Sequence, residues 1–454
     1  MRRHWMIAGL FAALTSFCSG QLAAQDGNDG WGSYVQADKD WAAQKVPPIV
    51  VEVVAGSEQK AQTPAGWYVP DEHTSVLPLP GQGGTFLVFT GGHTTTHSGA
   101  IVMTTTDFQH FEDASAYGYD SPVMTPLEPM DQNLCTSPHD SLFDDNYSAP
   151  GSVFPDPGSY GTWLMLYEAE NHCRNNIMVM PFYASVGVAR SLDRGLTWPA
   201  PAFVSAGYDS PVRYEGASSQ TPKPTNDTAY VGDAIPSGLV SDGYVYAYFT
   251  DFIVGGTYQI EVARARDDGN DPLTFWKYNA ANGWSTPAST RDGAVTAAGS
   301  SLITFPEGFV CGDVGVQEVD LDGQWSELQL WGRLFVMTME CDNRDNGKIV
   351  ASDVTPQGAW FYATTRSLER QQWSAPALIS NTLQYIDCSS GQFDGYYPSF
   401  VSPRLPPAHL GSRGRALYLD GSTTGAHSLG VRDFQISVGT PAPFQPLPSK
   451  PCSP

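Results

Sequence analysis

The chain has 454 residues and a formal net charge of −23 at pH 7, with 47 acidic residues against 24 lysines and arginines. This surplus of negative charge repels nucleic acid and anionic membrane surfaces, so neither is expected as a partner. Aromatic residues make up 12% of the chain, which also contains 45 glycines and 35 prolines. Such a composition is typical of an all-β protein with many turns.

The first 24 residues predict an export signal peptide. A basic tip precedes an apolar run from Trp5 to Phe17, and the segment ends in small residues at Ala24. The run is shorter than the roughly 20 apolar residues of a membrane-spanning helix. We therefore expect cleavage after Ala24 and a secreted or periplasmic mature chain of residues 25–454, with no membrane attachment.

The sequence contains five copies of one pattern between residues 71 and 432. Each copy has an acid-rich turn, a first strand, a hairpin and a second strand of bulky residues. The acids that mark the turns are Asp71, Asp145, Asp233, Asp313 and Asp394. The first and second strands are expected at 74–79 and 85–90, 147–154 and 162–167, 234–240 and 244–249, 314–319 and 333–339, and 396–401 and 415–419.

Each copy continues into a third strand, and four copies continue into an aromatic fourth strand. The third strands are expected at 100–105, 185–190, 259–264, 360–366 and 428–432, and the fourth strands near Phe111, Trp198, Trp276 or Trp284, and Trp373. The fifth copy lacks its fourth strand, which the β-branched run at about 49–54 can supply. The pattern predicts a single five-bladed β-propeller domain of four-stranded antiparallel blades over residues 25–454.

Six cysteines follow the predicted signal peptide, and none forms a C-x-x-C pair. An even number of cysteines in an exported chain favours disulfides over a zinc or redox site. Alignment of the repeats favours the pairs Cys135–Cys173, Cys311–Cys341 and Cys388–Cys452.

The segment 191–198 (SLDRGLTW) matches the Asp-box, S-x-D-x-G-x-T-W, and degraded copies stand at 367–373 and 105–111. In this motif an acid and a hydroxyl hold a tight turn on the side away from the ligand. With the blade pattern, the chain resembles the five-bladed β-propeller glycosidase superfamily, which is arabinanase- and xylosidase-like, over nearly the whole mature chain. The resemblance is to an architecture rather than to one enzyme.

Sialidases, which also carry Asp-boxes, bind a substrate carboxylate with three arginines. In this chain the repeated arginines close the third strands, which places them on the far face. We therefore do not expect sialidase activity. These arginines are Arg190, Arg264, Arg366 and Arg432.

The resemblance implies that the turn before each first strand and the loop after each second strand face the ligand. Most glycosidases need one protonated and one ionised carboxyl group. By position in the resembled superfamily, Asp145 and Asp233 are the expected ionised groups. Glu170 or Glu168 is the expected proton donor, with Glu340 as the reserve, because crowded carboxylates raise the pKa of at least one of them.

Further polar and aromatic residues of the same turns and loops are expected to bind the substrate. These are Glu72, Asp313, Asp394, Tyr147, His93 and Tyr396. His93 and His97 could form a two-histidine metal site, but exposed loop histidines are the favoured interpretation. No metal site and no cofactor are expected, and Ca²⁺ at an acidic cluster such as Asp140, Asp144 and Asp145 is left open.

The sequence therefore predicts a secreted, monomeric glycoside hydrolase that acts on a polysaccharide or oligosaccharide through a carboxylate pair in the propeller funnel. The alternatives are a non-catalytic carbohydrate-binding propeller, a polysaccharide lyase and a scaffold for protein contacts. No G-x-S-x-G, P-loop or H-E-x-x-H motif occurs, which excludes the corresponding serine hydrolase, nucleotide-binding and zinc-protease classes.

Overall fold

A computed structural model describes residues 48–94, 98–121, 147–156, 158–159, 161–171, 182–198, 230–253, 257–267, 273–287, 299–320, 333–345, 348–349, 356–386, 395–421 and 428–448. Several predicted features lie outside these ranges. They are the signal peptide, Asp140, Asp144, Asp145, Asp394, His97, Cys135, Cys173, Cys388 and Cys452.

The described residues are almost entirely strands and turns, with one short 3-10 helix, η1 (Ala114–Tyr117). No helix among them is long and apolar enough to cross a membrane. The strands form five antiparallel units in chain order. Unit 1 contains β3 (Ser75–Pro78), β4 (Phe86–His93), β5 (Ser98–Thr105) and β6 (Glu112–Asp113); unit 2 contains β7 (Tyr147–Pro155), β8 (Trp163–Asn171) and β9 (Phe182–Ser191).

Units 3 to 5 follow the same order from an inner strand outward. Unit 3 contains β10 (Tyr230–Ser241), β11 (Tyr244–Ile253), β12 (Thr257–Arg266), β13 (Phe275–Asn279) and β14 (Gly283–Pro287). Unit 4 contains β15 (Val310–Val319), β16 (Phe335–Asp342), β19 (Gln357–Thr365) and β20 (Ala377–Leu378). Unit 5 contains β22 (Tyr396–Val401), β24 (Arg413–Asp420), β25 (Ser428–Val438) and β1 (Ile49–Val53).

Five further strands of two residues each remain. They are β2 (Gln59–Lys60) on β25, β21 (Gln384–Tyr385) on β19, β23 (His409–Leu410) parallel to β15, and the pair β17 (Arg344–Asp345) and β18 (Lys348–Ile349).

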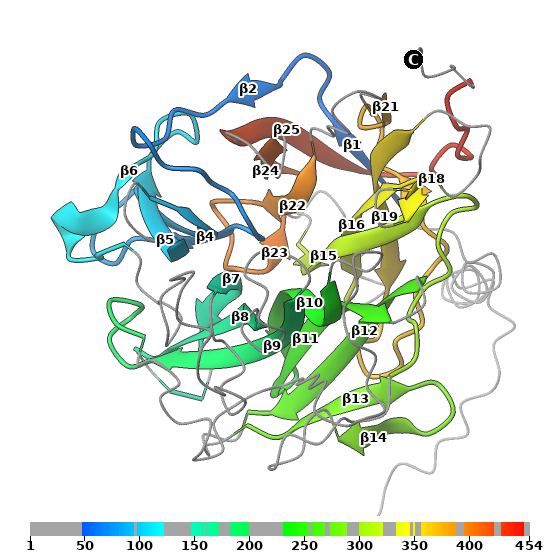
Figure 1. Cartoon of the computed structure of the whole chain (residues 1–454), viewed down its shortest axis with the longest axis horizontal. Coiled ribbons are helices and arrows are strands. Elements are labelled where there is room, and N and C mark those ends of the chain that lie inside the picture. Colours follow the sequence, from blue (N-terminus) through cyan, green and yellow to red (C-terminus); the bar gives the residue numbers. More distant parts are fainter. Residues whose placement is uncertain are drawn as a thin grey trace, which may run out of the picture.

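Apolar side chains from consecutive units pack together in five clusters. Each cluster is shared by two units, in the cyclic order 1–2, 2–3, 3–4, 4–5 and 5–1. The cluster between units 5 and 1, for example, joins Leu417 and Leu429 to Val88 and Ile101. Because every unit buries both faces of its sheet against its neighbours, the units follow one another around a central axis (Figure 1).

All five inner strands line one central cavity, which the segment 402–409 after β22 also borders. Serine hydroxyls on three inner strands accept hydrogen bonds from backbone amides of the next unit. The donor and acceptor pairs are Val153 N and Ser75 Oγ (2.9 Å), Gly238 N and Ser152 Oγ (2.9 Å), and Thr74 N and Ser399 Oγ (2.8 Å). Polar contacts at the axis therefore supplement the apolar packing between units.

The ring is closed by a strand from the other end of the chain. β1 pairs antiparallel with β25, with Ile49 opposite Val438 and Val53 opposite Phe434. Its alternate residues are buried against units 4 and 5, because successive side chains of a strand point to opposite faces. The outermost strand of unit 5 thus comes from the N-terminal part of the chain.

The predicted all-β propeller is confirmed. The count of five blades stays a prediction, which the five units and their cyclic packing support. One difference from separate blades is that units 2 and 3 form a continuous eight-stranded sheet. The reason is that β10 begins at Tyr230, before the expected start at 234, and its first residues pair parallel with β9.

The turn after β9 is held by side-chain hydrogen bonds. Ser191 Oγ donates to Asp193 Oδ1 (2.7 Å) and accepts from Gly195 N (2.7 Å). Asp193 accepts two more bonds from the amide and hydroxyl of Thr197, at 2.8 and 2.6 Å. The following Trp198 is buried at the interface with unit 1. The segment therefore acts structurally, at the end of the sheet where third strands finish.

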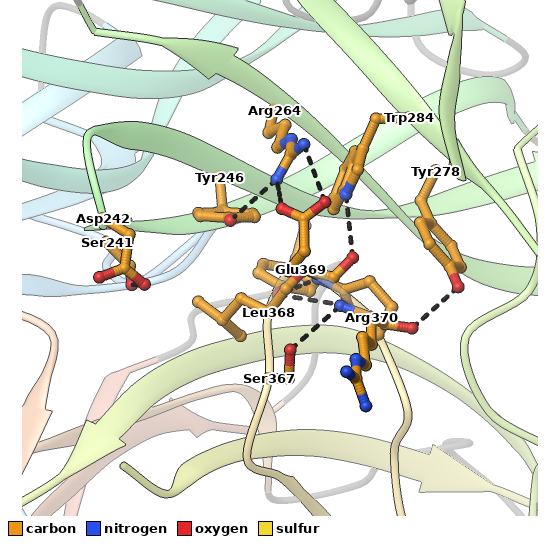
Figure 2. A network of polar contacts seen from close by, with 12 residues as sticks. Ser241, Asp242, Tyr246, Arg264, Tyr278, Trp284, Ser367, Leu368, Glu369 and Arg370 are labelled. Carbon is orange, nitrogen blue, oxygen red and sulfur yellow. Dashed lines mark hydrogen bonds and ion pairs between the residues drawn. The ribbon is translucent and has the colours of Figure 1, made fainter. Parts of the chain in front are cut away.

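Arg264, one of the repeated arginines, ties unit 3 to the equivalent turn of unit 4 (Figure 2). Its guanidinium forms an ion pair with Glu369 and lies 4.2 Å from the ring centroids of both Tyr244 and Trp284. The indole N–H of Trp284 donates to the carbonyl of Glu369 at 3.0 Å. These cation–π and ion-pair contacts hold the side chain of Arg264 at the end of the sheets where the third strands finish.

The predicted disulfide Cys311–Cys341 is confirmed and joins opposite residues of β15 and β16. The C-terminal tail after β25 returns to the same unit. Phe444 packs edge-on against Phe309 and Phe361, with ring centroids 5.4 and 5.1 Å away. The tail therefore covers the sheet that the disulfide also stabilises.

Ring closure by β1 can be tested with one substitution. Val51→Asp places a charge in the cluster between units 4 and 5, where Val51 is 1% exposed. We expect the free energy of unfolding to fall by about 3 kcal/mol or more, because a buried charge has no partner there. Urea unfolding measures the change. The control is Val50→Asp on the half-buried opposite face of β1, and equal losses in the two variants would contradict the closure.

Candidate active site

Four inner strands carry an extra residue close to their first residues. The pairing of β7, β10, β15 and β22 with the second strands shifts by one residue at 150–152, 234–237, 312–315 and 396–399. Three of these bulges hold a non-glycine residue in the left-handed backbone region. These residues are Ile235 (φ 54°), Asp313 (φ 50°) and Tyr397 (φ 56°). Bulges redirect side chains. At the end of the axis where these inner strands begin, they bring polar side chains together, and this end is called the mouth.

Asp71 lies in the turn before β3, where its amide donates to the carbonyl of Gly91 (2.9 Å). Gly91 is required here, because a Cβ would come within 2.8 Å of the Asp71 carbonyl oxygen. The Tyr147 hydroxyl donates to Asp71 Oδ2 at 2.8 Å, and His93 Nε2 lies 3.5 Å from the same oxygen. The hydrogen bond to Asp71 raises the pKa of His93. Asp71 is therefore a carboxylate held between two donors.

The carboxyl groups of Glu72 and Glu168 share a hydrogen bond although they come from units 1 and 2. Both residues are 3% exposed. Burial, with the charge of Glu168 next, raises the pKa of Glu72 well above its usual range. Burial, with the charge of Glu170 next, raises the pKa of Glu168 to about 8. Since a hydrogen bond between two carboxyl groups needs a proton, Glu72 is the donor in this bond, and the raised pKa of both residues favours a protonated pair at neutral pH.

Glu168 also holds the strained bulge of unit 3. The amide of Ile235 donates to Glu168 Oε2 at 2.5 Å. A β-branched residue with positive φ is a clear backbone outlier, so it needs such a partner. Glu168 thus connects the first three units at the mouth.

A second acidic group lies on units 4 and 5. Asp313 Oδ2 accepts a hydrogen bond from the amide of Tyr397 at 3.2 Å, and burial raises the pKa of Asp313 to about 7. Burial and the charge of Asp342 raise the pKa of Glu340 well above its usual range. Arg344 donates to Asp342 Oδ2 through Nη2 (2.8 Å) and through Nε (3.2 Å). This ion pair lies beside Glu340.

The two acidic groups face each other across one mouth. The charge of Asp313 contributes to the raised pKa of Glu72. Tyr397 is close to both groups, since Asp71, Glu72, Asp313 and Glu168 all contribute, after burial, to raising its pKa. The mouth therefore brings together carboxyl groups from units 1, 2, 4 and 5.

Asp233 lies in a separate buried cluster within unit 3. Lys277 Nζ, from the fourth strand, is 3.4 Å from both Asp233 Oδ2 and Glu261 Oε2. Asp251, directly opposite Asp233 in the sheet, completes the cluster. Burial raises the pKa of Asp233 to about 6 and that of Asp251 to about 9. Because Asp233 is fully buried, its carboxylate neutralises Lys277 rather than facing the mouth.

The structure brings together most of the described residues that the sequence analysis proposed, and separates one. Asp233 stands apart with Lys277, and Asp145 and Asp394 lie outside the described residues. Glu170 is half-buried, and its charge acts on Glu168, Tyr147 and His93. The residues at the mouth are Glu168, Glu170, Glu340, Glu72, Asp313, Tyr147, His93 and Tyr396.

Several residues of these clusters were not proposed as site residues from the sequence. Asp71 was used only to mark the repeat, although its neighbour Glu72 was chosen. Tyr397 lies in an expected first strand but was not among the proposed substrate-binding residues, and Arg344 and Lys277 give no signal in the sequence. Lys277 belongs to an outer strand and reaches Asp233 only because its side chain is long. Among the described residues, no group of three or more histidine, cysteine or acidic side chains is placed to hold a metal ion.

No protein-family model and no curated protein matches the chain. The chain is similar to three solved structures that are glycosidases by name. They are the catalytic domain of a Coprinopsis cinerea α-L-arabinofuranosidase (12% identity, 84% of this chain and 98% of that chain, TM-score 0.44), a Penicillium chrysogenum α-L-arabinanase (10%, 84% and 98%, 0.43) and a Bombyx mori β-fructofuranosidase (9%, 90% and 68%, 0.40). At these identities and scores, the similarity defines neither the substrate nor the chemistry of this chain.

The raised pKa of Glu168 predicts a pH-dependent stability. Its value rises from 4.5 to about 8 on folding, so the folded protein binds more protons than the unfolded chain between these values. This contribution is fully present below pH 4.5 and is lost as the pH rises through about 8. We expect Glu168→Gln to reduce the loss of unfolding free energy over that range, as measured by urea unfolding at several pH values. The exposed Glu112→Gln is the control, and an unchanged pH slope in Glu168→Gln would contradict the assignment.

The cluster around Lys277 predicts a large loss on removal of its cation. Lys277→Met leaves Asp233 and Glu261 buried without a counter-charge, so we expect a loss of about 3–5 kcal/mol at neutral pH. The loss should shrink in acid, because protonation neutralises the two carboxylates. The exposed Lys60→Met is the control. A loss that is the same at pH 5 and pH 8 would show that packing, not charge, is responsible.

Proposed function

We propose that this protein is an exported glycoside hydrolase that uses carboxyl groups at the mouth of the propeller. The observation that carries the proposal is the protonated Glu72–Glu168 pair next to the carboxylate of Asp71. A protonated and an ionised carboxyl group in one site are what glycosidic bond cleavage requires.

Glu168 is the proposed proton donor to the leaving oxygen. Its pKa of about 8 keeps it protonated at neutral pH, and Glu72 lies within hydrogen-bonding distance to share a proton with it. After the transfer, the amide of Ile235 is already placed to stabilise the negative charge on Oε2. The backbone bond thus favours the product state of the proton transfer.

Asp71 is the proposed ionised group, acting as base or nucleophile. Its side chain is 24% exposed, so it is accessible from the mouth. Tyr147 and His93 both contact Oδ2, so Oδ1 is the oxygen proposed to act on the substrate. Asp342 is less suited to this role because both its oxygens already accept bonds from Arg344.

The polysaccharide lyase alternative has less support from the mouth. A lyase needs its substrate carboxylate to be neutralised, and the carboxyl groups here outnumber the cations of the described mouth, His93 and Arg344. Arg344 is already paired with Asp342. Because a uronate would have to compete with Asp342 for Arg344, an uncharged or cationic sugar is the proposed substrate class.

Activity on a panel of plant, algal and microbial glycans tests the proposal. Asp71→Asn and Glu168→Gln should each lower kcat on the order of 10²–10⁴-fold while the fold is retained. Wild-type activity should also fall as the pH rises through about 8, because the proton donor is lost. Reducing-end assays at several pH values measure both effects.

The matched control for these variants is Asp113→Asn, which changes an exposed aspartate that caps η1 away from the mouth. It should leave kcat unchanged. If the wild type binds a glycan without cutting it, the protein is a carbohydrate-binding propeller instead. If it neither binds nor cuts any glycan, the glycosidase proposal fails.

A further inference from the structure

Two consecutive tyrosines of β22 point to the same side of the sheet. Successive side chains of a regular strand point to opposite faces. In β22 the rings of Tyr396 and Tyr397 lie only 6.4 Å apart between centroids. The bulge between Tyr396 and Ser399 produces this arrangement, because Tyr397 adopts a φ of 56°. The extra residue therefore adds a second aromatic side chain to the mouth.

The backbone of Tyr397 is held in a conformation that its sequence disfavours. A φ of 56° lies in the left-handed region, which favours glycine over a residue with a Cβ. The following Pro398 further restricts Tyr397 towards extended conformations. The hydrogen bond from its amide to Asp313 Oδ2, at 3.2 Å, stabilises this geometry. Backbone strain of this kind concentrates at functional sites.

The three described tyrosines of the mouth differ in what their hydroxyl groups contact. The Tyr147 hydroxyl donates to Asp71 at 2.8 Å, and the Tyr396 hydroxyl accepts from Arg344 Nη2 at 2.7 Å. The Tyr397 hydroxyl has no hydrogen-bond partner among the residues that the structure describes. Tyr397 therefore offers a hydrogen-bond donor that the described residues do not use.

The surroundings of Tyr397 indicate which group would accept its hydrogen bond. Its ring lies close to Asp71, Glu72, Glu168 and Asp313. Glu168 is the proposed proton donor and Asp71 the proposed ionised group. Burial and these charges raise its pKa well above the usual range, so the hydroxyl keeps its proton. An uncharged sugar at this point presents hydroxyl and ring oxygens, all of which can accept the bond.

We propose that Tyr397 is a substrate-binding residue whose hydroxyl donates a hydrogen bond to an oxygen of the sugar unit held between the two acidic groups of the mouth. This assignment rests on the proposed glycosidase function and adds a determinant of sugar specificity to it. The bulge in β22 then places the Tyr397 hydroxyl at the mouth.

Tyr397→Phe tests the assignment, because it removes one oxygen and keeps the ring, the bulge and the amide bond to Asp313. We expect an unchanged melting temperature and a kcat/KM that falls about tenfold or more on the glycan that the wild type cuts. An analogue of that glycan lacking single hydroxyl groups should lose less activity in Tyr397→Phe than in the wild type, at the position that Tyr397 contacts. The control is Tyr385→Phe, which removes a hydroxyl bonded to the Pro448 carbonyl on an outer strand of unit 4, and it should keep full activity.

The outcomes separate this assignment from the proposed function. If the wild type cuts a glycan and Tyr397→Phe cuts and binds it equally well, the role of Tyr397 is wrong and the glycosidase stands. If the wild type binds a glycan without cutting it, weaker binding by Tyr397→Phe supports the residue while the glycosidase fails. If the wild type binds no glycan, both fall.

Discussion

The extra residue in each of four inner strands is the constraint on which the mouth depends. At two of these bulges, a backbone amide finds its acceptor in a carboxyl group of the preceding unit. Glu168 of unit 2 accepts from Ile235 of unit 3, and Asp313 of unit 4 accepts from Tyr397 of unit 5. The same carboxyl groups are thereby buried and brought close to other acids. Backbone geometry and acid–base properties are therefore coupled, because neither arrangement is stable without the other.

Contacts elsewhere in the ring offset the free-energy cost of burying carboxyl groups and straining the backbone at the mouth. Five apolar clusters join the units in cyclic order, and serine hydroxyls bridge neighbouring inner strands below the bulges. At the opposite end of the sheets, the Arg264–Glu369 ion pair joins units 3 and 4. These contacts between units lie away from the mouth, which allows several buried acids to remain close together there.

The strand pattern and the repeats predicted the all-β propeller and the approximate position of each strand, because alternation and turn residues are local signals. They also selected Glu72 and Glu168, since both follow from their place at the start of a first strand and the end of a second strand. The role of Asp233 could not be predicted in this way, because its partner Lys277 lies on an outer strand 44 residues away. The bulges could not be predicted from the sequence either, since one extra residue moves Tyr397 into the mouth without changing the composition of β22.

The pairing of β1 with β25 has a consequence for how the molecule is made. Ile49 finds its partner, Val438, at nearly the opposite end of the polypeptide. A growing chain therefore exposes the edge of β1 until the last strand has been synthesised, and only then can the two ends meet. Contacts of such long sequence separation form slowly, because a large loop must close first. The final step of folding is thus expected to join the earliest and latest parts of the polypeptide.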